Sequence, residues 1–118
     1  MKKFLYFADG NGANATGESV AVLAENIKSI IPVTTTTTAM YYADLDGAID
    51  KIVFTHDDTT TTSGHRVRDI AKAIAECANA TAHINGMTDV VDLDNSIYYG
   101  NLSFITALAI SLGVSLDY

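Results

Sequence analysis

Histidine and cysteine are the side chains of this sequence best suited to proton transfer, nucleophilic attack or metal binding. His56 and His65 lie at the two ends of one polar segment, and Asp57 follows the first of them. Two imidazoles and a carboxylate can bind zinc or move protons when a further ligand or a nucleophile lies beside them. The sequence shows neither, so we expect exposed loop histidines and no catalytic residue. An enzyme that uses His56 and His65 is the minor alternative.

The single cysteine, Cys77, cannot form an internal disulfide, and it falls on the apolar stripe of a predicted helix. This position indicates a buried hydrophobic side chain rather than a reactive thiolate.

Acidic turns are the other candidates for chemistry, because carboxylate oxygens bind hard cations such as Ca²⁺. Asp44 and Asp46 flank one turn, and Asp89, Asp92 and Asp94 lie close together further along the chain. Neither group has the alternating ligands and closing glutamate of a calcium loop, and aspartate is common in turns. The sequence therefore predicts no metal ligand and leaves weak cation binding open.

The segment Gly10–Ala15 superficially matches a dinucleotide-binding loop, but no helix opens directly after its glycines. We expect a flexible loop and no cofactor. An alternative function uses this loop, Gly10–Gly17, in a small ligand- or nucleic-acid-binding β-barrel whose bases or rings stack on tyrosines. The candidate platforms are Tyr41, Tyr42, Tyr98 and Tyr99. The net charge of −7 argues against nucleic acid, which requires a basic surface.

The elements that must position these residues are mainly strands. The segment 19–33 fits either a helix or two short strands, and Pro32 with the threonines behind it favours strands. One helix is predicted over 64–79, with Ser63 as its N-cap and apolar residues at helical spacing. The other predicted strands are 2–8, 34–43, 50–56, 88–93 and 97–116.

The C-terminal segment 102–116 alternates large apolar residues at even positions with small residues at odd positions. A period of two places the two sets on opposite faces of a strand. A strand of this length exceeds the usual range, so we expect it to bend sharply or split, with bends at Gly100 and Gly113. Its large side fills the core, while its small side is covered by the helix or by a second copy. On that basis Ala109→Asp would bury an unpaired charge and abolish folding or assembly.

Composition predicts a single domain, 1–118, of mainly β (α+β) class. The expected fold is a small, partly open antiparallel β-barrel or coiled sheet of five to seven strands, comparable in size to Sm-like and SH3-like barrels. The helix is inserted between strands and packs on the sheet. The apolar stretch after the basic start is too short for a signal peptide, and the period of two in 95–116 argues against a membrane span. We expect a soluble protein and leave its location open.

Only 18% of the residues are charged, which suggests that part of the surface is covered by another molecule. Arg66 and Arg68 stand at the start of the predicted helix, where the macrodipole disfavours basic groups. They either pair with nearby aspartates or meet an acidic surface on a partner. The sequence predicts a non-enzymatic structural or assembly module that forms homo-oligomers through strand edges and apolar faces. Its candidate interface residues are Arg66, Arg68, Phe104, Ala107, Ala109 and Ser111.

Several ordered segments together resemble a group of small, uncharacterised proteins from tailed phages of marine cyanobacteria. The segments are Lys3–Phe7, Asp50–Thr55, the helix with His65, Val67, Ala71, Ala73 and Ile74, and Val90–Asp92 before an alternating C-terminal strand. The resemblance implies a virion-associated or accessory phage protein, with other virion proteins as partners and the virion or the host cytoplasm as its location. It transfers no functional residue.

Overall fold

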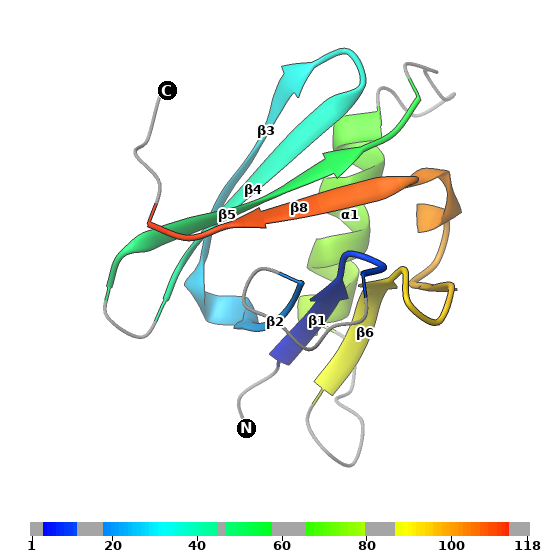
Figure 1. Ribbon diagram of the computed structural model, residues 1–118. Coiled ribbons are helices and arrows are strands. Elements are labelled where there is room, and N and C mark those ends of the chain that lie inside the picture. Colours follow the sequence, from blue (N-terminus) through cyan, green and yellow to red (C-terminus); the bar gives the residue numbers. More distant parts are fainter. Residues whose placement is uncertain (1–3, 12–17, 45–46, 58–65, 80–86, 114–118) are drawn as a thin grey trace.

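The computed structural model describes residues 4–11, 18–44, 47–57, 66–79 and 87–113. These residues form two four-stranded sheets and one α-helix, without a closed barrel, and 52% of them lie in strands (Figure 1). The predicted mainly β class with one inserted helix is confirmed. Eight strands are present where five to seven were expected. The predicted partly open β-structure is therefore confirmed, and its strands are divided between two sheets.

The first sheet has the order β2-β1-β6-β7, and the second has the order β3-β4-β5-β8. The chain changes sheet at the short 3-10 helix η1 (Ala24–Asn26), between β2 and β3. All strand pairs are antiparallel except β1 with β6, which are parallel; strands β2 to β5 and helix α1 lie between them in sequence and provide the long connection that parallel strands need. The strands of the first sheet are β1 (Phe4–Ala8), β2 (Ser19–Leu23), β6 (Met87–Asp92) and β7 (Ile97–Tyr98). Those of the second are β3 (Ile27–Thr34), β4 (Thr37–Ala43), β5 (Ile49–Thr55) and β8 (Ala107–Ser111).

The prediction of strands rather than a helix within 19–33 is confirmed. The predicted strand 34–43 starts too early, because Thr35 and Thr36 form the turn between β3 and β4. Side-chain hydroxyls stabilise this turn: Thr34 Oγ1 lies 2.7 Å from Thr37 Oγ1 and accepts a hydrogen bond from the Thr36 amide at 3.2 Å.

The helix α1 (Arg66–Asn79) stands behind the second sheet in Figure 1. Its buried residues are Ile70, Ala73, Ile74 and Cys77, which follow the i, i+3, i+4, i+7 pattern of one apolar stripe. The predicted helix is confirmed over these residues, whereas its expected start at Ser63–His65 lies outside the described residues. The helix has 14 residues, and no described helix has the length and apolar composition needed to cross a bilayer.

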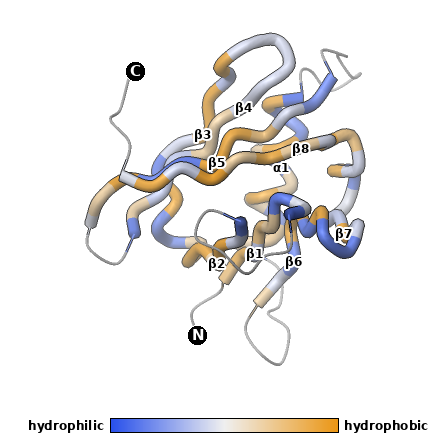
Figure 2. Tube along the Cα trace, in the orientation of Figure 1, coloured by the Kyte–Doolittle hydropathy of each residue, from blue (hydrophilic) through white to orange (hydrophobic). Residues whose placement is uncertain are grey.

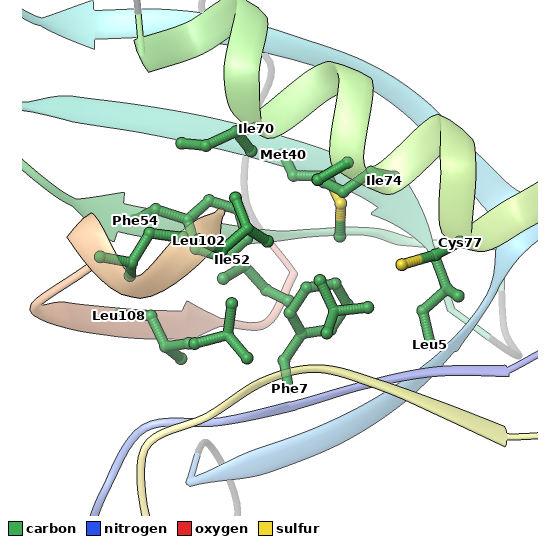
Figure 3. Close-up of a cluster of buried hydrophobic side chains, with 14 of the residues drawn as sticks. Leu5, Phe7, Met40, Ile52, Phe54, Ile70, Ile74, Cys77, Leu102 and Leu108 are labelled. Atoms are coloured by element: carbon green, nitrogen blue, oxygen red, sulfur yellow. The ribbon is translucent and has the colours of Figure 1, made fainter. Parts of the chain in front are cut away.

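The core lies where α1 and the two sheets meet. On β5 the alternation is as predicted: Ile52 and Phe54 are fully buried, and their neighbours are half-buried. Phe7 from the first sheet contacts Phe54 from the second, with ring centroids 5.8 Å apart. Figure 3 shows these side chains pointing toward Ile70 and Ile74 of the helix. Burying each large apolar side chain stabilises the fold by roughly 1.5–3 kcal/mol, so the contact between the sheets depends on this cluster.

The alternating segment 102–116 is split rather than continuous, as its length allowed, but the helical turn within it was not predicted. The segment forms a 3-10 helix, η2 (Leu102–Phe104), and then the five-residue strand β8. Gly100 before η2 and Gly113 after β8 have φ of +56° and +64°, a left-handed conformation that interrupts extended structure. Residues 114–116 lie outside the described residues.

The predicted covering of the small side by the helix is wrong, whereas its covering by a second copy stays a prediction. Leu102, Ile105 and Leu108 are buried, whereas Ala107 and Ala109 are exposed. The helix packs against β3, β6 and η2, and it shares the core with the large side chains. The large side chains of β8 face the core cluster, and Ala107 and Ala109 on its other side are exposed among the described residues.

Candidate functional site

Strand β8 carries the exposed small residues and lies at one edge of the second sheet. It pairs with β5 from Thr55↔Ala107 to Lys51↔Ser111 without a register shift. Its sequence, ALAIS, has no charge and no proline, and Figure 2 shows no strongly hydrophilic residue along it. A straight, uncharged edge strand presents backbone donors and acceptors to which another strand can pair.

The start of β8 is held firmly in place. The amide and the hydroxyl of Thr106 both donate to the Thr55 carbonyl, at 2.9 and 3.4 Å. Leu102 and Ile105, each about 1% exposed, fix the preceding turn in the core. The edge is therefore a pre-ordered surface, so a partner strand does not have to pay the entropy of ordering it.

The face of the sheet that includes the small side of β8 is almost neutral. Cross-strand partners share a face, so the rows can be followed from the register. Across β4, β5 and β8 these rows are Thr37–Thr55–Ala107, Ala39–Val53–Ala109 and Tyr41–Lys51–Ser111. Lys51 is the one charged residue among these nine. Ser111 is half-buried at the end of β8.

Arg66, at the start of α1, lies beside Phe104 of the predicted interface and is held by local contacts. Its Nε lies 2.9 Å from Asp57 Oδ1, and its Nη1 lies 3.5 Å from Asp69 Oδ2. Its guanidinium carbon stands 4.2 Å from the ring centre of Phe104, which is half-buried against the core. The hydrogen bond to Asp57 raises the pKa of Arg66 above its usual value. The geometry thus supports local pairing for Arg66, while Arg68 is exposed on the helix.

His56 is buried, so the prediction of a solvated loop histidine is wrong for this residue. Its Nδ1 lies 2.6 Å from the Asp57 carbonyl oxygen, which can only accept, so Nδ1 carries the hydrogen. In the neutral ring Nε2 then accepts from the hydroxyl of Thr38, 2.8 Å away. Both ring nitrogens are occupied, and the ring packs edge-on against Phe104. This arrangement fits a structural role. His65 lies outside the described residues.

Cys77 is fully buried, as predicted. Burial first and the charge of Glu76 second raise the pKa of its thiol to about 12. A thiol in this environment stays protonated at neutral pH and is a poor nucleophile or metal ligand.

The acidic turns are explained by local hydrogen bonds. The buried carboxylate of Asp92 accepts from the amides of Asp94 and Asn95 at 3.1 and 3.3 Å, and from the Asn95 side chain at 2.9 Å. The Asp44 carboxylate accepts from the Ala48 amide at 3.1 Å. Within the described ranges no group of three or more His, Cys, Asp or Glu side chains has the arrangement of a metal site. Asp46 lies outside them.

The tyrosines proposed as stacking platforms are not open surfaces. Tyr41 and Tyr42 are buried, and Tyr98 and Tyr99 are half-buried against the core. The loop 12–17, which forms the rest of that candidate site, lies outside the described residues.

Sequence reasoning missed a polar group between the sheets. Tyr42 and Asp50 are cross-strand partners on β4 and β5, each 3% exposed, and both line a pocket. The signal was present in the sequence, because Asp50 occupies the same alternating positions of β5 as the core residues Ile52 and Phe54. A carboxylate on the apolar side of a strand is costly to bury unless a hydrogen-bond donor or a cation pairs with it.

Comparison with protein-family models, with curated proteins and with solved structures finds no match for this chain.

Proposed function

We propose that this chain is a non-enzymatic assembly module that forms a homodimer by pairing β8 with β8 of a second copy. The observation that carries the proposal is the edge position of β8, an ordered and uncharged strand whose small side chains Ala107 and Ala109 are exposed. Strand addition of this kind draws its affinity mainly from backbone hydrogen bonds.

A twofold axis through Ala109 pairs all five residues of β8. It places Ala107 opposite Ser111 of the second copy, and Leu108 opposite Ile110. The β3-β4-β5-β8 sheet of one copy then joins the same sheet of the second copy to form one eight-stranded sheet. Small side chains meet small ones on one face and large apolar ones meet on the other, so the edge is complementary to itself.

The other described edges are less suited to pairing. Strand β3 contains Lys28 and Pro32 and has two register shifts against β4, all features that blunt an edge. Strand β7 has only two residues. Strand β2 is uncharged, but it follows Glu18 directly and Glu25 lies two residues beyond its end. No residue from 95 to 113 is charged, so β8 lies in the longer neutral region.

Electrostatics gives this association a particular salt dependence. Each copy carries a net charge of −7, so two copies repel one another at long range. Salt screens that repulsion, with a Debye length of about 10 Å at 0.1 M, and leaves backbone pairing of a neutral strand largely unaffected. Dimerisation should therefore strengthen from low to moderate salt.

A structural role also agrees with the state of the reactive side chains. Both ring nitrogens of His56 are hydrogen-bonded, and Cys77 is fully buried. From the resemblance to phage proteins we further propose that the assembly belongs to a phage particle or a phage accessory complex, with other virion proteins as further partners.

Sedimentation equilibrium of the wild type, Ala109→Lys and Ala21→Lys tests the proposal. Ala21 is the matched control, because it is an exposed alanine on β2, the uncharged edge of the other sheet. We expect a wild-type dimer, an association at least about tenfold weaker in Ala109→Lys because two ammonium groups meet at the axis, and no such change in Ala21→Lys. A monomeric wild type at about 100 μM, a range where even weak complexes form, overturns the proposal. So does a dimer that Ala21→Lys disrupts and Ala109→Lys leaves intact.

A further inference from the structure

A pocket of about 300 Å³ lies between the two sheets, where β1, β2 and η1 face β4 and β5 (strands in Figure 1). Its walls are mainly apolar and include Phe4, Val20, Val22 and Leu23. Its polar lining consists of Asn26, Tyr42, Asp44 and Asp50. An apolar pocket with a few converging polar groups is the usual form of a small-molecule site, and this volume is at the lower end of the range.

The hydroxyl of Tyr42 is the first sign that the pocket takes a ligand. Tyr42 is 3% exposed, and its hydroxyl makes no hydrogen bond with the described residues. A buried hydroxyl left without a partner costs about 1–3 kcal/mol, and such groups are rare in native proteins. Burial, then the charges of Asp50 and Asp44, raise the pKa of Tyr42 to about 12, so the group is a neutral phenol that faces two carboxyl groups.

The two carboxyl groups are the second sign. Asp50 is 3% exposed, accepts a hydrogen bond from the Gly113 amide at 2.9 Å and interacts electrostatically with Asp44. Burial raises the pKa of Asp50, the Gly113 amide acts in the opposite direction, and Asp44 raises it further. None of the described lining residues is basic. The pocket therefore concentrates negative charge and oxygen acceptors beside an apolar wall.

We propose that this pocket binds a small primary amine with an apolar body. An ammonium group has three donors, which match the Tyr42 oxygen and the carboxylates of Asp44 and Asp50. Its charge offsets that of the acidic pair, and charge-assisted hydrogen bonds of this kind are the stronger ones. The apolar body lies against Val20 and Val22, and the ring of Phe4, 39% exposed, stands at the rim. No residue of β8 lines the pocket, so this site is independent of the proposed dimer.

Titration with 2-phenylethylamine tests the proposal, with 2-phenylethanol as its uncharged analogue of nearly the same shape. Binding is followed by the ¹H–¹⁵N spectrum of the full chain, which also reports whether each variant is folded. We expect saturable shifts centred on Val20–Leu23 and on Tyr42 and Ala43, and affinity for the alcohol at least about tenfold lower, since the charge-assisted bonds are lost.

Two variants and two matched controls identify the polar groups responsible. Tyr42→Phe and Asp50→Asn should each weaken amine binding about tenfold or more, while Tyr98→Phe and Asp89→Asn, whose residues lie outside the pocket, should leave it unchanged. Equal affinity for the amine and the alcohol contradicts recognition of the ammonium group. Shifts that fail to saturate, or that centre away from the pocket, overturn the site itself. Because Asp50→Asn preserves an acceptor for the Gly113 amide, it remains informative if Tyr42→Phe loses its fold.

Discussion

Leu108 and Ala109 are adjacent on β8, yet the structure places their side chains in opposite environments. Leu108 is 7% exposed and belongs to the core cluster, whereas Ala109 is exposed on the other face. Truncating a buried leucine to alanine removes its transfer free energy and leaves a cavity, which together cost about 2–5 kcal/mol. Aspartate at an exposed strand position costs at most about 1 kcal/mol through its low β-propensity. Leu108→Ala should therefore destabilise the chain far more than Ala109→Asp.

Urea unfolding followed by circular dichroism measures both free energies of unfolding. Each variant is measured at two protein concentrations, because a dimer adds a concentration-dependent contribution that a monomer lacks. We expect Leu108→Ala to lose at least about 2 kcal/mol at both concentrations and Ala109→Asp to lose about 1 kcal/mol or less at the lower one. A loss for Ala109→Asp that equals or exceeds the loss for Leu108→Ala, at both concentrations, would refute the placement of the two faces.

Three further predictions concern buried polar and titratable groups. Because burial raises the pKa of the Cys77 thiol to about 12, a thiol reagent such as DTNB should not label the native protein at pH 8 and should label it fully in concentrated urea; rapid native labelling would contradict the burial. Thr38→Val leaves Nε2 of His56 without its partner in the core and should destabilise the fold by about 1–3 kcal/mol in urea unfolding, more than Thr37→Val on the half-buried neighbour; equal effects would contradict the buried hydrogen bond. The pKa of Asp50 is raised in the folded state, so its ionised form disfavours folding at pH 7 and this effect vanishes below the ordinary value of 3.8. Asp50→Asn should therefore raise stability at pH 7, with a gain that shrinks on acidification toward pH 3; a variant less stable than wild type at pH 7 would contradict this sign.

The elements that were predicted correctly each bury a single face, so their apolar residues recur at the period of that element. On β5, Ile52 and Phe54 alternate with half-buried residues, and on α1 the stripe through Ile70, Ile74 and Cys77 faces one core. In both cases a single buried face determines the pattern. The prediction could therefore be made from neighbouring residues alone.

The C-terminal segment shows where that reasoning fails. Its alternation of large and small residues continues through Leu102–Phe104, but a 3-10 turn interrupts the strand there and brings Ile105 into the core. The pattern also cannot tell which elements cover each face, because that depends on contacts distant in sequence. Leu108 shares the core cluster with the helix residues, and Ala107 and Ala109 remain exposed.

The buried polar groups depend on distant partners in the same way. The buried ring of His56 is satisfied by a hydrogen bond to Thr38, eighteen residues earlier, on the neighbouring strand of the second sheet. The parallel pairing of β1 with β6 joins segments about eighty residues apart. Asp50 could have been recognised from the sequence, because it falls in the apolar alternation of β5. Its partners Tyr42 and Gly113 could not.

Oxidative cross-linking at β8 tests the proposed assembly most directly. With the twofold axis through Ala109, cysteines introduced there lie directly opposite one another, at the roughly 4.5–5.5 Å Cβ separation of paired strands and close to that of a disulfide. The native thiol, Cys77, is buried and does not compete. Under mild oxidation Ala109→Cys should form a disulfide-linked dimer within the time in which Ala21→Cys, on the edge of the other sheet, stays monomeric. An Ala109→Cys chain that remains monomeric, or cross-links no faster than Ala21→Cys, would contradict pairing through β8.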